Sequence, residues 1–155
     1  MRQVRGPEVP GGPARIIEVP VRRYRCVPCG RTHSVVPRGI VPQMLFSAAA
    51  IGLALALWTM LGLCAARVRR EISPWSVVGA TSAAGWSSLR RWADRAPEWF
   101  VGIRDSPAEF TRRQRAERAA ASLCVAALPG GRDLREQVFR GAARSVRGEG
   151  PVIPS

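Results

Sequence analysis

The chain has 155 residues, enough for one compact domain or two very small ones, which excludes a large multidomain enzyme. Its 24 basic and 11 acidic residues give a formal net charge of +13, and the sequence contains no lysine. This charge attracts a polyanion, either nucleic acid or an anionic membrane surface, and arginine suits bidentate contacts to phosphate and guanine. A GC-rich coding sequence would give the same absence of lysine.

The start of the chain and its cysteines indicate a reducing compartment. The first forty residues are rich in Arg, Pro and Gly and lack the apolar stretch of a signal peptide, so we expect a cytoplasmic protein. Of the four cysteines, Cys26 and Cys29 alone are close enough in sequence to share a local site, and in the cytoplasm they indicate a metal-type pair. We expect Cys64 and Cys124 to be small core residues.

The first forty-two residues predict a tail followed by a small β unit. Residues 1–14 carry three Pro and three Gly and predict a flexible tail. Residues 15–24 are rich in β-branched side chains and predict a short edge strand, and residues 32–36 predict a returning strand. Residues 15–42 are therefore expected to form a zinc-ribbon-like β-hairpin knuckle.

The segment Met44 to Ala66 contains no charged residue and permits two interpretations. It is long enough to cross a bilayer as one helix with arginines on both sides. Alternatively, Ser47 caps a helix over 48–61 that Gly62 ends, and a second helix covers 64–72. In that case the first helix has to be buried nearly all round.

The rest of the chain predicts further helices. After a loop over 77–85, apolar periodicity with Pro and Gly boundaries predicts three of them, at residues 86–96, 108–128 and 133–144. The predicted class is mainly α, a helix-turn-helix-like domain preceded by the knuckle. The expected segments are a tail (1–14), the knuckle (15–42), the helix-turn-helix-like region (43–100), C-terminal helices (101–145) and a disordered tail (146–155).

The motif Cys26-Val27-Pro28-Cys29-Gly30 is the sharpest chemical signal. Two thiolates at this spacing hold one side of a tetrahedral zinc ion, and the glycine permits the turn. A structural zinc ion needs four ligands, and His33, the chain's one histidine, brings the number to three. Three alternatives stay open: a zinc site completed by a further ligand, a knuckle that binds no metal, and a redox pair.

The run from Val21 to Pro42, VRRYRCVPCGRTHSVVPRGIVP, resembles the zinc-ribbon entry of a family of transposase-like bacterial proteins. In that family CxxCGRTH precedes a helix-turn-helix, and an upstream cysteine pair completes the zinc site. Residues 1–25 contain no cysteine, a departure that suggests a shortened start or a decayed copy. The resemblance implies sequence-directed DNA binding in transposition.

A helix-turn-helix assigns roles to the basic residues of the predicted helices. The second helix crosses the phosphate backbone and the third lies in the major groove. The expected DNA-binding residues are Arg22 and Arg23 on the strand, Arg67, Arg69 and Arg70 on the second helix, and Ser87, Ser88, Arg90 and Arg91 on the third. Arginine on an outward helix face is also common as plain solvated surface.

The sequence favours binding over catalysis. Its few acids lack the strand-end context that gathers three carboxylates for metal-assisted phosphoryl transfer, and no nucleophile stands beside a base. The first hypothesis is therefore a DNA-binding protein related to the N-terminal part of a transposase, with no catalytic centre and a separate catalytic subunit. The alternatives are a single-pass membrane protein spanning at 44–66 and a truncated or decayed reading frame.

Overall fold

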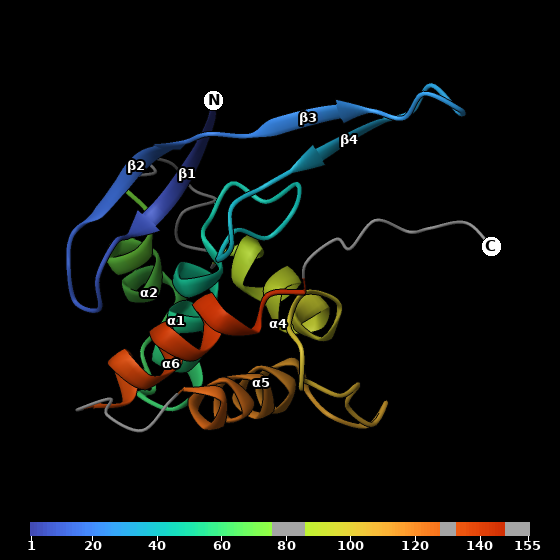
Figure 1. Ribbon diagram of the computed structural model, residues 1–155. Coiled ribbons are helices and arrows are strands. Elements are labelled where there is room, and N and C mark those ends of the chain that lie inside the picture. The colour runs from blue at the N-terminus through green and yellow to red at the C-terminus, as the bar shows by residue number, and fades with distance from the viewer. Residues whose placement is uncertain (76–85, 128–132, 148–155) are drawn as a thin grey trace.

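A computed structural model of the chain describes residues 1–75, 86–127 and 133–147. In these ranges two small antiparallel sheets lie to one side of a set of helices (Figure 1). The strands are β1 (Arg2–Pro7), β2 (Ala14–Val19), β3 (Arg22–Arg25) and β4 (Thr32–Val35). The helices are α1 (Ala48–Thr59), α2 (Ala65–Ile72), α4 (Ser87–Trp99), α5 (Arg112–Ala126) and α6 (Leu134–Ser145). The described residues combine helices with two small sheets, so the mainly α prediction agrees with the helices and underestimates the strands. The predicted loop at 77–85 lies outside the described residues.

Helix α1 forms the centre of the core. Ser47 caps it as predicted, because its Oγ accepts a hydrogen bond from the amide of Ala50 at 3.1 Å. Every residue from Ala48 to Leu57 is buried, and α2, α4, α5 and α6 all pack against the helix. Close packing requires Gly52, since a Cβ there would lie 2.6 Å from the Cβ of Ala142 on α6. The apolar composition of this segment is thus explained by burial among helices.

The segment Met44 to Ala66 is not one continuous helix. Helix α1 has twelve residues, and the chain then turns through Gly62, whose φ is +67°, before α2 begins. A left-handed φ favours glycine, which explains why the helix ends here. No helix in the described ranges has both the length and the apolar character needed to cross a membrane.

The N-terminal residues differ from the expected tail. β1 pairs with β2 from Arg2↔Val19 to Pro7↔Ala14, and Val4 is buried. Backbone hydrogen bonds from Arg5 to Leu45 O (2.7 Å) and from Ser47 to Arg5 O (3.0 Å) fasten the strand beside the start of α1. The composition of residues 1–14 is turn-like, yet these long-range contacts order them.

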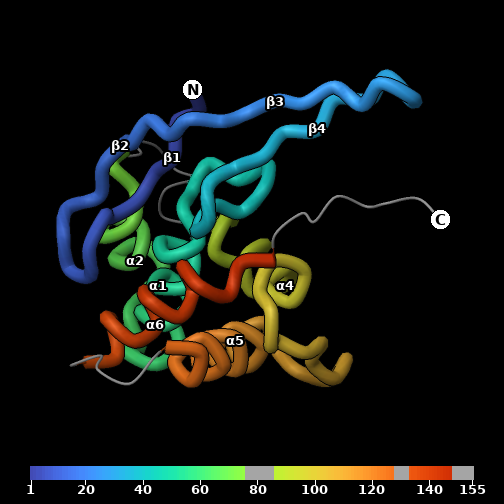
Figure 2. Tube along the Cα trace, in the orientation of Figure 1, coloured from blue at the N-terminus to red at the C-terminus, as the bar shows by residue number. Residues whose placement is uncertain are grey.

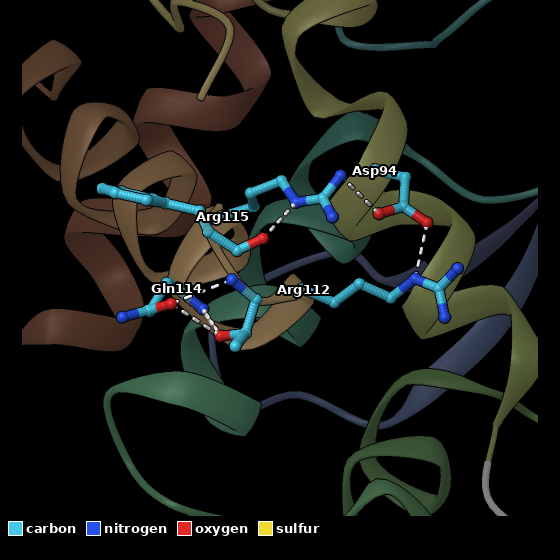
Figure 3. Close-up of polar contacts among 6 residues, drawn as sticks. Asp94, Arg112, Gln114 and Arg115 are labelled. Atoms are coloured by element: carbon cyan, nitrogen blue, oxygen red, sulfur yellow. Dashed lines mark hydrogen bonds and ion pairs between the residues drawn. The ribbon is translucent and has the colours of Figure 1, made fainter. Parts of the chain in front are cut away.

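Helices α4 and α5 are joined by an ion-pair cluster at the start of α5 (Figure 3). The Asp94 carboxylate on α4 accepts from Arg112 Nε at 2.8 Å and lies 3.1 Å from Arg115 Nη1. A capping box of Thr111 and Gln114 closes the same helix terminus. Helix α4 continues through Pro97 to Trp99, past the predicted end at residue 96. The amide of Phe100 donates a hydrogen bond to the carbonyl oxygen of Ala96.

We expect Asp94→Ala to lower the free energy of unfolding by about 1 kcal/mol, because one partly buried carboxylate serves two arginines. Glu98→Ala, which removes the more exposed pair with Arg95, is the matched control and should change stability by less than about 0.5 kcal/mol. Urea unfolding measures both. Equal losses of stability in the two variants would show that the ion pairs of Asp94 contribute no more than the exposed pair of Glu98.

Candidate nucleic-acid interface

The strands β3 and β4 form a hairpin that projects away from the helices (Figures 1 and 2). We call residues 22–35 the arm. Its register runs from Arg22↔Val35 to Arg25↔Thr32, and all eight strand residues are exposed. A ribbon exposed on both faces contributes no core, so its side chains are available to a partner.

A tight turn reverses the chain at the tip of the arm. We call this turn, residues 26–31, the knuckle from here on. The amide of Cys26 donates to Arg31 O at 2.8 Å, and the amide of Gly30 donates to Cys26 O at 2.9 Å. Gly30 has a φ of +68°, which favours glycine at this position. A hairpin with a CxxCG turn is therefore present, but the single predicted strand over 15–24 is not. Ala14–Val19 pairs with β1, and only Arg22–Arg25 pairs with the returning strand β4.

The arm carries unopposed positive charge. Arg22, Arg23, Arg25 and Arg31 lie in a stretch, residues 19–70, that contains no acidic residue. No ion pair is found for any of the four within the described part of the chain. The charge of an arginine without an acidic neighbour is not compensated within the protein, and its N–H donors are available to a polyanion.

The register divides the arm into two faces, because directly opposed residues of a ribbon point to the same side. One face bears four hydrogen-bonding side chains, those of Arg23, Arg25, Thr32 and Ser34. The other face bears Arg22, Tyr24, His33 and Val35. The first face is thus uniformly polar, whereas the second mixes an aromatic and an aliphatic side chain with two basic ones.

Two basic grooves flank the base of the arm. One, of about 930 Å³, includes Arg2, Arg23 and His33 in its lining and runs between the arm and the Pro42–Gln43 loop. The other, of about 470 Å³, is lined in part by Arg38, Arg144 and Arg147. Neither groove has an acidic residue among its described lining residues. The positive surface of the arm therefore continues onto the body of the protein.

The predicted residues of α4 adjoin this surface. Gln43 lines both the larger groove and a third one, in which Ser88 and Arg91 also take part. Arg90 and Ser87 are exposed on the same helix, and Arg91 donates to Ser88 Oγ at 3.5 Å. The structure thus links the α4 residues to the arm through the loop before α1.

The predicted arginines of α2 belong to a different surface. Arg70 lines a groove with Glu71 and Arg135, and Glu71 is 2.8 Å from the Arg135 guanidinium and 3.9 Å from that of Arg67. Arg69 is half-buried on the same helix. An acid at the centre of this group lowers its attraction for phosphate, so it is a weaker candidate than the arm.

The expected helix-turn-helix pairing is not seen in the described residues. Helix α2 packs against α1 and β1, whereas α4 packs against α1 and α5. A helix-turn-helix requires its second and third helices to meet directly. Here both helices pack on α1, which lies in the centre of the core, and α4 packs in addition on α5.

Two of the three candidate metal ligands lie together at the tip, and the third lies on a strand. Cys26 and Cys29 share the knuckle, but His33 lies on β4 opposite Tyr24. In the described ranges no group of three or more His, Cys, Asp or Glu side chains comes together as a metal site. Within these ranges one chain thus brings two thiols together at the tip, whereas a structural zinc ion takes four ligands.

The thiols of Cys29 and Cys124 lie in different environments, which shift their pKa values in opposite directions. A hydrogen bond from the backbone of Arg31, with a second from the Cys26 thiol, lowers the pKa of Cys29 from its ordinary value. Burial raises the pKa of the Cys124 thiol in α5. Hydrogen bonds to sulfur favour the thiolate, and desolvation disfavours it.

We therefore expect iodoacetamide to alkylate Cys29 at lower pH than Cys124 when metal is removed with EDTA. A lowered pKa means that the thiolate of Cys29 is already formed at a pH where Cys124 remains protonated. Peptide mass spectrometry over pH 6–10 measures both rates, with Cys29→Ser as the control. A Cys124 rate that rises first would contradict the assignment.

Six basic residues of this surface were not predicted from the sequence: Arg2, Arg25, Arg31, Arg38, Arg144 and Arg147. The alternation within RRYR could have indicated Arg25, because it shares a strand face with the predicted Arg23. Arg144 and Arg147 follow more than a hundred residues later, and their approach to Arg38 depends on how α6 packs, which no local pattern shows.

Comparison of the chain with protein-family models, with curated proteins and with solved structures finds no match. The function of this chain is therefore inferred from the arm and its surroundings.

Proposed function

We propose that this protein binds duplex DNA through the arm and the two basic grooves at its base. The observation that carries the proposal is an exposed hairpin with four arginines that form no ion pair in the described part of the chain. The strands of this hairpin bury little surface against the rest of the protein. The charge and shape of the hairpin suit a partner that is polyanionic and grooved.

The arm is a two-stranded antiparallel ribbon, a kind of element that can enter a DNA groove. The B-DNA major groove is about 12 Å wide and admits a two-stranded β-ribbon. In this proposal the face with Arg23, Arg25 and Ser34 meets base edges, since arginine recognises guanine and serine accepts or donates to several bases. In the same proposal Tyr24, which lies on the opposite face of the arm, would stand beside the sugar-phosphate walls.

The grooves at the base of the arm supply contacts to the backbone. Arg38, Arg144 and Arg147 come from the loop before α1 and from the end of α6, so they are held by the body of the protein. Phosphate contacts of this kind position the protein, whereas base contacts give it sequence preference. In this proposal the chain supplies DNA binding in a transposase-like system, and a separate subunit supplies catalysis.

The experiment that tests the proposal is a salt titration of binding to a duplex of about 20 base pairs. The three phosphate contacts of Arg38, Arg144 and Arg147 predict a slope of log K against log salt of about −3, since each neutralised phosphate releases counterions. A double-stranded RNA of the same sequence is the control. Its major groove is deep and narrow and does not admit a ribbon, so weaker binding is expected. No binding to DNA at 50 mM salt would contradict the proposal.

A further inference from the structure

The tip of the arm presents two thiols at the spacing of half a zinc site. Cys26 and Cys29 flank the knuckle, and a structural zinc ion requires four ligands at tetrahedral positions. The backbone hydrogen bonds of Cys26 and Gly30 already fold the chain around this position. The knuckle is therefore formed as a two-ligand unit.

The same chain has no further pair of soft ligands for this tip. Cys64, just before α2, is exposed, so the prediction of a core residue is wrong there, and Cys124 on α5 is half-buried. Both belong to the helical body, from which the arm projects (Figure 1). His33 does not form a metal-binding group with the knuckle thiols among the described residues. The ranges 76–85, 128–132 and 148–155 contain no cysteine or histidine in their sequence.

The tip is open to a second molecule. Cys29 is exposed, and Val27 between the two cysteines is 94% exposed, an apolar side chain at the end of the arm. The guanidinium of Arg25 lies 3.9 Å from where a Cβ on Gly30 would be, and Arg31 follows directly. A zinc ion bound by four thiolates carries a net charge of −2, which these arginines would offset.

We propose that Cys26 and Cys29 form half of a zinc site that a second copy of the chain completes, so that a four-cysteine zinc ion joins the tips of two arms. The two halves are identical and are related by a twofold axis, as in the commonest form of homodimer. Val27 of each copy would be covered at the same contact. This inference concerns the tip alone and does not depend on DNA binding.

The test uses the full chain with a reductant and 0.3 M salt, which screens repulsion between the arms. Sedimentation equilibrium and metal analysis are expected to give a monomer in EDTA and, with ZnCl₂, a dimer with one zinc ion per two chains. Cobalt substitution should give the visible absorption of a tetrahedral four-thiolate site. Cys26→Ser and Cys29→Ser should each abolish both the dimer and this absorption.

The controls separate the proposed site from other thiols and from unfolding. Cys64→Ser and Cys124→Ser should keep the metal-dependent dimer, and His33→Ala should keep it as well. The circular dichroism of Cys29→Ser should equal that of the wild type, since the knuckle lies outside the core. A zinc-bound monomer, absence of zinc binding, or a dimer that survives Cys29→Ser would each overturn the proposal.

Discussion

Replacement of Arg23 and Arg25 by alanine is expected to weaken binding to duplex DNA by at least ~30-fold at 0.1 M salt. Both residues lie on one face of the arm, are exposed and form no ion pair in the described residues. Because the proposal places both arginines against base edges rather than phosphates, the affinity should fall while the slope of log K against log salt changes by less than about 1. Fluorescence anisotropy with a labelled duplex at several salt concentrations gives both quantities.

The matched control removes the same charge from α5. Arg113 and Arg118 are exposed, and α5 lies on the side of the body away from the arm (Figure 1). Their replacement by alanine should lower affinity less than about 3-fold, through the change in net charge alone. If the two double variants bind equally, the arm has no special role and the binding depends on overall charge.

The largest expected effect on stability is at Gly141, where α6 approaches α5 most closely. A Cβ at this position would overlap the carbonyl oxygen of Leu123, which belongs to the backbone and cannot rotate away. The helices would have to separate, and Leu123 and Val138 would lose packing. We expect Gly141→Ala to lower the free energy of unfolding by at least about 3 kcal/mol, although alanine is the better helix former.

Urea unfolding followed by circular dichroism measures this change. Val125→Ala on the neighbouring helix is the control, because Val125 is 86% exposed and should change stability by less than about 0.5 kcal/mol. A stabilised Gly141→Ala variant would contradict the close approach of the two helices and, with it, the placement of α6.

Local signals were sufficient to predict most helices. The run of Ala and Leu after Ser47, a capping side chain, and Gly62 at the following turn agree with α1 and its end. Asp133 likewise begins the last helix, where its carboxylate accepts from the amide of Glu136 at 2.8 Å. These features depend on residues three or four apart, which a sequence displays directly.

Features that depend on distant contacts were not predicted. Strand β1 contains a Gly-Pro pair that resembles a turn, but Gly6 permits contact with α1, since a Cβ there would lie 2.5 Å from the Cβ of Ala50. The pairing of α4 with α5 rather than α2 depends in part on Asp94, whose partners follow about twenty residues later. Such pairings are determined by tertiary packing, and the helix or strand propensity of the residues does not predict them.

The candidate site likewise combines residues that local sequence predicts with residues that only the fold brings together. Arg22 and Arg23 were predicted because they adjoin the knuckle, and the structure places them on the arm. The grooves at its base combine segments far apart in the sequence, with Arg38 beside Arg144 and Arg147. Their convergence follows from the position of α6 against α1, so it becomes visible only in the folded chain.

Photo-cross-linking to a duplex that contains 5-bromodeoxyuridine tests most directly whether the arm contacts DNA. The bromine of this base lies in the major groove, where the proposed face with Arg23 and Arg25 would meet base edges. Mass spectrometry of the digested adducts is expected to find the cross-links within residues 22–35, and the replacement of Arg23 and Arg25 by alanine should reduce them. Cross-links confined to α2 or α5, with the arm unmodified, would contradict the proposed interface.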